Sequence, residues 1–382
     1  DLHLCDRRQR QMCIRDSFVS ALKAIAPLLV FFLVISSLCN AGKSHGGVIK
    51  TVIILYMFST VLAAVIAVFA SMAFPVKMTL ANAATDTSAP QGIVEVLNNL
   101  LLNVVANPVS SLVNANYVGI LMWAVLLGLA FRAADKMTKK VLADVADGIS
   151  MVVTWIINLA PFGIFGLVFN TVSTNGLDIF TTYGKLLLLL VGCMLFIYFV
   201  TNPLLVYWCI RQNPYPLIFQ CLKRSALTAF FTRSSAANIP VNMKVCEEMG
   251  LDRDTYSVTI PLGATINMDG AAITITVMTM ATAFTLGIHV DIPTAIILSL
   301  LAALSACGAS GVAGGSLLLI PMACSLFGIS DDISMQVVAV GFIIGVVQDS
   351  VETALNSSSD LLLSASAEFR QWRLEGKEIK FK

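Results

Sequence analysis

Long apolar runs separated by short polar segments make up most of this chain. A membrane-spanning helix needs about 20 mainly apolar residues, and five regions predict such spans, the third of them segmented: 18–40, 48–74, 94–131, 149–172 and 183–210. The composition agrees, because 57% of the residues are hydrophobic and only 12% are charged, whereas a soluble domain carries about 25% charged residues. The sequence therefore predicts an all-α polytopic membrane protein, with the lipid bilayer around it and no nucleic acid as a partner.

An internal repeat follows the last of these runs. Two segments rich in small and polar residues, 230–238 and 305–316, are each followed by Ile-Pro, an acidic helix start and an apolar helix. The spacing from that proline to an aspartate inside the helix is 29 residues in the first copy (Asp269) and 28 in the second (Asp349). Such segments predict re-entrant hairpins, since irregular backbone at membrane depth persists only where protein or a cavity surrounds it. Two units of a hairpin and a broken helix predict a secondary transporter with its site at their interface.

The pattern divides the chain into segments with different roles. We expect a non-native leader over 1–17, scaffold and peripheral transmembrane helices over 18–211, a transport core over 216–366 and a cytoplasmic tail over 367–382. Within the core we expect a hairpin at 216–243, a broken helix at 254–288, a second hairpin at 293–325 and a polar-striped helix at 332–366. If the basic loops face the cytoplasm, the arginines of the leader would lie outside, so we expect that a native first helix is missing.

One helix of the core carries a stripe of polar residues. At 3.6 residues per turn, one face of this helix holds Asp349, Glu352, Thr353, Asn356 and Asp360. An ionisable side chain at membrane depth costs from roughly 3 to more than 10 kcal/mol. The stripe must therefore face a wet cavity, a partner charge or an ion, which makes it a candidate ligand site or cation path.

The other core helix contains a polar interruption. Gly263 and Gly270 bracket Asn267 and Asp269, so an unwound turn there would free carbonyl oxygens beside a carboxylate. These are the hard oxygen ligands that an alkali cation prefers. The alternative is a polar kink that neighbouring hydroxyl groups satisfy, and the residues alone leave both interpretations open.

Four segments together resemble one transporter family. They are Thr-Arg-Ser-Ser at 232–235, Asn-Met-Asp-Gly at 267–270, the Gly-rich segment at 305–316 and the polar stripe at 349–360. On these motifs the chain resembles the dicarboxylate/amino acid:cation symporter family, and from residue 18 to about 366 it is similar to the bacterial sodium/serine-threonine symporters of that family. The resemblance implies sodium-coupled uptake of small neutral amino acids, most of all L-serine and L-threonine, by a multi-pass protein of the bacterial inner membrane.

The same resemblance implies a fold and a set of functional residues. The implied fold is an inverted-repeat, elevator-type transporter with two re-entrant helical hairpins, assembled as a homotrimer and without enzymatic activity. The residues that it assigns to the substrate are Ser234, Ser235, Val312, Asp349, Glu352, Thr353 and Asn356. Those that it assigns to sodium ions are Tyr56, Ser59, Thr60, Gly263, Thr265, Asn267, Asp269, Asn356 and Asp360. In this scheme Asp349 holds the substrate ammonium group.

The chain departs from the family pattern at two positions. Members that carry acidic substrates have an arginine where this chain has Glu352, and the threonine that usually follows Asn-Met-Asp-Gly is Ala271 here. A carboxylate on the substrate side chain would meet a like charge, so glutamate and aspartate are poor candidates. Arg233 has two interpretations: it anchors the chain at the cytoplasmic side, or it pairs with Glu352 or Asp349, since an unpaired buried charge is costly.

Two other classes of protein deserve comparison. Residues 308–311 fit the Gly-x-Ser-Gly of rhomboid-type intramembrane serine proteases, but no histidine follows Ser310 to act as the base. A cation channel is the second rival, because rings of carboxylates line cation pores. Saturable solute uptake that depends on a sodium gradient distinguishes a symporter from a channel.

Overall fold

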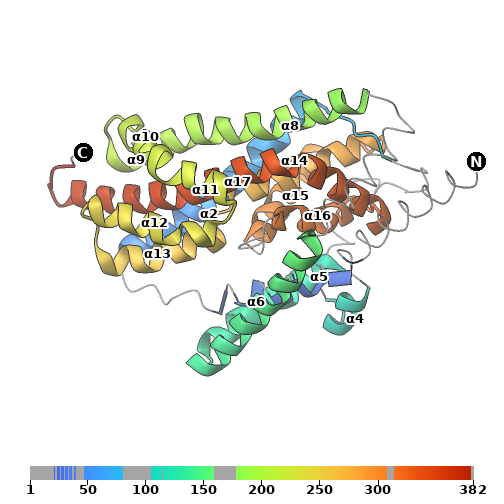
Figure 1. Cartoon of the computed structure of the whole chain (residues 1–382), viewed down its shortest axis with the longest axis horizontal. Coiled ribbons are helices and arrows are strands. Elements are labelled where there is room, and N and C mark those ends of the chain that lie inside the picture. Colours follow the sequence, from blue (N-terminus) through green and yellow to red (C-terminus); the bar gives the residue numbers. More distant parts are fainter. Residues whose placement is uncertain are drawn as a thin grey trace, which may run out of the picture.

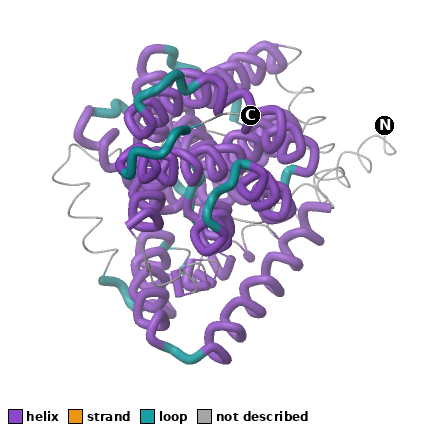
Figure 2. Tube along the Cα trace, turned by 90° about the vertical axis from the view of Figure 1, so that its left-hand side faces the viewer, coloured by secondary structure: helices purple, strands orange, loops and turns teal. Residues whose placement is uncertain are grey.

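In the computed structural model, helices account for nearly all of the chain that is described (Figures 1 and 2). The structure describes residues 47–80, 105–114, 116–158, 178–307 and 314–379, together with parts of 21–39. Within these ranges there is no β-strand. The predicted all-α class is confirmed. The predicted leader at 1–17, the Gly-x-Ser-Gly segment and Val312 lie outside the described residues.

The first half of the chain forms helices that follow the apolar pattern. In order they are α2 (Gly47–Ala73), α4 (Pro108–Val113), α5 (Tyr117–Ala130), the 3-10 turn η1 (Phe131–Ala133) and α6 (Lys136–Asn158). In Figure 1, α6 extends away from the other helices, whereas α5 packs against α16 (Ile320–Ser325). α6 starts well before residue 149, where the span was predicted, because Asp135 Oδ1 accepts a hydrogen bond from Thr138 N (2.7 Å) and so stabilises an earlier helix start.

The predicted span at 183–210 is one helical stretch with a local irregularity. It consists of α8 (Asp178–Phe196), the π-helical turn η2 (Ile197–Thr201) and α9 (Asn202–Ile210). Pro203 has no N–H and cannot donate to the carbonyl of Phe199 four residues earlier. That carbonyl instead accepts a hydrogen bond from Tyr215 Oη (3.3 Å), and the π-helical turn, in which Asn202 N donates to Ile197 O, lies directly before the proline.

The second half of the chain forms the compact part of the molecule. Its elements are α10 (Tyr215–Cys221), the π-helical turn η3 (Leu222–Ala226), α11 (Leu227–Thr232), α12 (Ser235–Glu248), α13 (Arg253–Ile266), α14 (Asp269–Thr285), α15 (Ile292–Ala306), the 3-10 turn η4 (Gly315–Leu319), α16 (Ile320–Ser325) and α17 (Asp331–Leu374). Side-chain oxygens of Ser234, Asp252 and Asp291 accept hydrogen bonds at the N-termini of α12, α13 and α15, as residues of these types do at helix starts.

Two helices form the centre of this half. Every residue of α14 from 269 to 283 is buried, so over that range the helix is enclosed by the protein on all faces. It packs against α2, α15 and α17. α17 has 44 residues, which gives a length of about 66 Å, and it runs along the long axis of the molecule (Figure 1). The polar stripe of α17 therefore faces α13 and α14 inside the protein.

Of the two helices predicted to be broken, one is continuous. α13 ends at Ile266 and α14 begins at Asp269, so the first helix is interrupted where its polar motif predicts. α17, in contrast, stays helical throughout the stripe at 349–360 and continues to Leu374, past the predicted end at 366. The prediction of a second break was wrong because the stripe contains no glycine or proline, and its polar side chains find partners on neighbouring elements instead of on their own backbone.

Candidate functional site

The break between α13 and α14 is held open by a neighbouring helix. Asn267 and Met268 leave helical geometry, with φ/ψ of −97°/81° and −119°/52°. The N–H of Met268 donates to Thr60 Oγ1 of α2 (3.2 Å), so a donor that the break would leave unpaired is satisfied. The interruption directs the side chains of Asn267 and Asp269 toward two different helices, α17 and α2.

Asp269 lies at the start of α14 and is fully buried. Its Oδ2 accepts a hydrogen bond from Ser59 Oγ (2.7 Å) and its Oδ1 accepts one from Thr60 Oγ1 (3.2 Å). The helix N-terminus also favours a negative charge at this position. The structure thus brings Ser59 and Thr60, two of the residues that the family resemblance assigned to sodium, against Asp269.

Asp360 approaches the other side of the break. Its Oδ1 accepts a hydrogen bond from Asn267 Nδ2 (2.9 Å). Gly263 makes this approach possible, since a Cβ atom there would lie 2.8 Å from Asp360 Oδ1 and from Tyr56 Oη. Tyr56 Oη donates to the backbone carbonyl of Asp360 (2.9 Å) and contacts Ser364 Oγ (2.7 Å). Tyr56 and Gly263 therefore lie next to Asp360, and the Tyr56 hydroxyl contacts the backbone of Asp360 and not its carboxylate.

The two carboxylates beside the break have only neutral partners. In the described part of the chain, the salt bridges do not include Asp269 or Asp360. Asn267 Oδ1 is buried and has no hydrogen-bond partner among the residues that the structure describes. Buried charges without a counter-charge are strongly unfavourable. The hydroxyl groups of a satisfied kink account for Asp269, but they leave Asp360 and Asn267 Oδ1 uncompensated, so this set of oxygens fits a hard cation such as Na⁺.

The break is joined to the polar stripe by Asn356. Its Oδ1 accepts a hydrogen bond from the N–H of Gly270 (2.7 Å), and its Nδ2 lies 3.5 Å from Met268 Sδ. Thr265 stands apart from this arrangement, because its half-buried hydroxyl donates to the carbonyl of Leu262 (2.7 Å) within its own helix. Asn356 therefore lies on the polar stripe and contacts the break, whereas the Thr265 hydroxyl hydrogen-bonds within its own helix.

Glu352 is held by three neutral donors. Its Oε2 accepts hydrogen bonds from Gln348 Nε2 (2.5 Å), Thr274 Oγ1 (2.7 Å) and Ser316 Oγ (2.9 Å). These donors come from α17, α14 and η4 respectively. A Cβ at Gly270 would lie 2.9 Å from Glu352 Cγ, so a glycine is needed there for the close approach of α17 and α14. One oxygen of Glu352 thus connects three elements of the core.

Asp349 lies where the two small-residue segments meet α17. Its Oδ1 accepts a hydrogen bond from the N–H of Gly314 (3.2 Å), and its Oδ2 lies 3.9 Å from Arg233 Nη1. Of the two partners predicted for Arg233, the structure therefore selects Asp349. The backbone of Arg233 is left-handed, with φ of 49°, which is uncommon for a residue other than glycine. The turn between α11 and α12 thus directs a cation toward Asp349.

The remaining substrate residues lie close to these along the chain. Ser234 follows Arg233 and accepts a hydrogen bond from Ala237 N (3.2 Å), while Ser235 is buried at the first turn of α12. Thr353 is buried on the stripe. The sequence reasoning did not select four buried polar partners: Asn202, whose Oδ1 accepts a hydrogen bond from Ser59 Oγ (3.5 Å), and Thr274, Ser316 and Gln348. Each is a polar residue at a buried position, a signal that becomes specific only when the packing is known.

Comparisons with known proteins place the chain in a family. The model of the sodium:dicarboxylate symporter family matches residues 6–368. The serine/threonine transporter SstT of Bifidobacterium adolescentis is 60% identical over 363 residues, which is 95% of this chain and 84% of that protein. The match begins inside the segment predicted as a leader, and that boundary stays a prediction. With a match over nearly its whole length, and with its buried carboxylates grouped around a helix break, the chain belongs to the sodium:dicarboxylate symporter family, a family of transporters and not of enzymes.

Proposed function

We propose that this protein takes up L-serine and L-threonine together with sodium ions across the bacterial inner membrane. One observation carries the proposal: the buried carboxylates of Asp269 and Asp360 have only neutral partners, and a third carboxylate, that of Asp349, lies on the same polar stripe as Asp360. The similarity to a bacterial serine/threonine transporter supports the choice of substrate. We further propose a homotrimer that moves its transport domain as an elevator, as the family resemblance implies.

The proposed sodium sites lie around the break between α13 and α14. The carboxylates of Asp269 and Asp360 supply the charge, while the unpaired Oδ1 of Asn267 supplies a neutral ligand. The other proposed contributors are the Gly263 carbonyl, the Asn356 side chain, the backbone around Thr265, and Tyr56, Ser59 and Thr60 of α2. Because Asn356 contacts both the break and the stripe, a cation bound at the break changes the surroundings of the substrate residues.

The proposed substrate site lies where both small-residue segments reach α17. Asp349 binds the substrate ammonium group. The ammonium group takes the place of the half-exposed Arg233 side chain, whose Nη1 lies 3.9 Å from Asp349 Oδ2. Ser234, Ser235 and Asn356 then face the substrate carboxylate, while Thr353 and the Val312 backbone complete the pocket. Glu352 repels a second carboxylate, because its own charge is kept in place by three hydrogen bonds, so the site selects small neutral side chains.

Uptake of labelled serine into proteoliposomes tests this function. We expect accumulation of serine only with an inward sodium gradient, and competition by threonine. An Asp360→Asn variant in the same vesicles is expected to need more sodium for the same uptake. Equal uptake with potassium on both sides would contradict sodium coupling, and a sodium current that does not depend on serine would favour the channel interpretation instead.

A further inference from the structure

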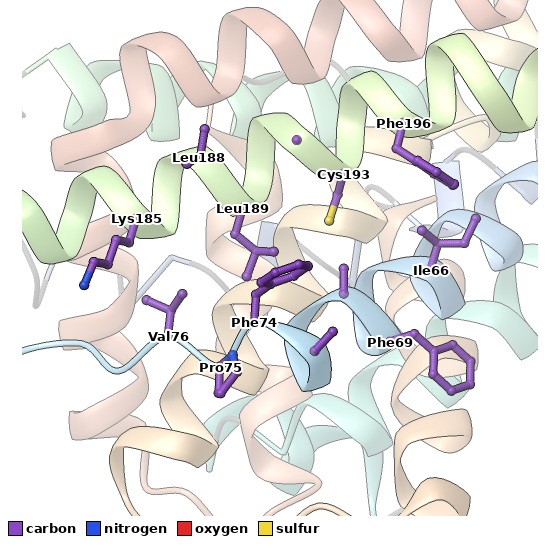
Figure 3. A pocket seen from close by; sticks show the side chains of 13 residues that line it. Ile66, Phe69, Phe74, Pro75, Val76, Lys185, Leu188, Leu189, Cys193 and Phe196 are labelled. Carbon is purple, nitrogen blue, oxygen red and sulfur yellow. The ribbon is translucent and has the colours of Figure 1, made fainter.

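An open apolar groove runs between α2 and α8, away from the candidate site. Its cavity volume is about 830 Å³, within the range of small-molecule sites, roughly 300 to 1,000 Å³. Figure 3 shows Lys185 and Val76 at one end of the groove and Ile66 and Phe196 at the other. We call it the α2–α8 groove.

The groove has the length of one membrane leaflet. From Lys185 to Phe196 the wall formed by α8 rises about 16 Å, at 1.5 Å per residue. Half of the hydrocarbon core of a bilayer measures about 15 Å. Lys185 lies near the start of the apolar stretch Tyr183–Ile210, which is where the membrane surface is expected. The groove therefore extends from the surface to about the middle of the bilayer, parallel to an acyl chain.

The lining has two chemical parts. Along most of its length the described lining side chains are apolar, and Phe74 (68% exposed) and Leu188 (74% exposed) remain open to the surroundings. The only charged residue among the described lining residues is Lys185, and it stands at the end of the groove. A polar solute such as an amino acid gains little from such walls, whereas an amphiphile with an anionic head matches both parts.

The floor of the groove is shaped by a glycine. Gly192 lines the groove, and a Cβ atom placed on it would meet nothing within 4 Å. The space above α8 at this position is therefore real, and a larger side chain would occupy it without a clash. Gly184 lies on the same helix, also has open space for a Cβ, and is not among the lining residues. Gly184 can therefore serve as the control for a substitution at Gly192, because only Gly192 lines the groove.

We propose that the α2–α8 groove is a binding site for an anionic phospholipid, with one acyl chain along Ile66, Leu189 and Phe196 and the phosphate at Lys185. On α2 the site lies toward the C-terminal end of the helix, beyond Tyr56, Ser59 and Thr60 along the chain. It is separate from the proposed sodium and substrate residues. Its existence does not depend on which amino acid the protein transports.

Photocrosslinking in vesicles tests the site. The full-length protein is reconstituted with a trace of phosphatidylglycerol or of phosphatidylcholine, each with a diazirine in the acyl chain, and the labelled peptides are mapped. We expect phosphatidylglycerol to label α2 and α8 at the groove more than phosphatidylcholine does. Gly192→Leu is expected to remove this labelling, while the control Gly184→Leu retains it.

Two lysine variants test the head group. Lys185→Gln is expected to lower the preference for phosphatidylglycerol about five-fold, which corresponds to about 1 kcal/mol for one lysine near a charged surface. Lys77→Gln removes another exposed lysine that does not line the groove and is expected to keep the preference. Equal labelling by the two lipids, unchanged labelling in Gly192→Leu, or the same loss in both lysine variants would overturn the proposal. Thermal unfolding of each variant shows that it is folded.

Discussion

Asp360 and Glu352 lie about two turns apart on α17, and both are buried, but their surroundings differ. One oxygen of Glu352 accepts three hydrogen bonds, from Thr274, Ser316 and Gln348. Within the described part of the chain, the carboxylate of Asp360 accepts one, from Asn267, whose own Oδ1 has no partner there. Hydrogen bonds to a charged group are worth roughly 1.5 to 3 kcal/mol each, so the protein itself stabilises Glu352, whereas the charge of Asp360 is left for the proposed sodium ion to compensate.

The largest difference is expected when each carboxylate is replaced by its amide. Asp360→Asn should weaken sodium binding at least about 100-fold, because it removes the charge that a cation compensates. Glu352→Gln retains an oxygen for the Thr274 and Ser316 hydroxyls and should change sodium affinity less than about three-fold. Calorimetric titration with sodium measures both. Equal losses in the two variants would show that the number of hydrogen-bond donors does not distinguish the roles of these carboxylates.

Asp349 allows the comparison to be extended to the substrate. Asp349→Asn removes one charge and almost no volume, and it should lower serine affinity about 10- to 100-fold through the loss of a charge-assisted hydrogen bond. Sodium affinity in the absence of serine should remain close to that of the wild type. Calorimetry with serine provides the measurement, and thermal unfolding is the control for folding. An unchanged serine affinity would refute the assignment of Asp349.

Gly263 tests how closely Asp360 must approach the break. In Gly263→Ala the new Cβ would lie 2.8 Å from Asp360 Oδ1, and such overpacking costs about 1 to 3 kcal/mol. We expect both a lower melting temperature and weaker sodium binding. Gly345→Ala on α17 is the matched control, because a Cβ there meets nothing within 4 Å; it should leave both quantities unchanged or raise the melting temperature. Normal sodium binding in Gly263→Ala would show that Asp360 is not part of the cation site.

Substitutions in α2 are expected to cause the smallest change in sodium affinity. Ser59→Ala removes the hydrogen bond to Asp269 Oδ2 and should lower sodium affinity about five-fold, equivalent to about 1 kcal/mol. Ser71→Ala is the control on the same helix, since the buried hydroxyl of Ser71 has no partner and its removal should not affect sodium binding. Sodium titrations of the two variants compare them. A larger loss in Ser71→Ala than in Ser59→Ala would show that α2 acts through packing alone.

Local chemistry was enough to predict the position of the helix break. Gly263 and Gly270 bracket Asn267 and Asp269, and residues of these types weaken a helix and offer oxygen ligands. The burial of the α17 stripe also followed from its periodicity and from the cost of charges in a membrane. Both features depend on residues that are close together in the sequence.

The partners of these residues could not be predicted in the same way. Ser59 and Asp269 are 210 residues apart, and Ser316 and Glu352 are 36 apart. Periodicity places Glu352 on the same stripe as Asp360, but it does not reveal which hydroxyl groups reach each carboxylate. The expectation of a second broken helix failed for a related reason, because the hydrogen-bond partners of the stripe come from the break, α14, η4 and Gln348 of α17 itself.

The dependence of serine affinity on sodium concentration tests the central claim most directly. Because sodium and serine sites that are coupled must influence each other equally, serine should bind more tightly as sodium rises in the wild type. In Asp360→Asn the same rise in serine affinity should require higher sodium concentrations, and at saturating sodium the serine affinity should return to the wild-type value. A serine affinity that is the same in sodium and in potassium would contradict the account, as would a loss in Asp360→Asn that no sodium concentration restores.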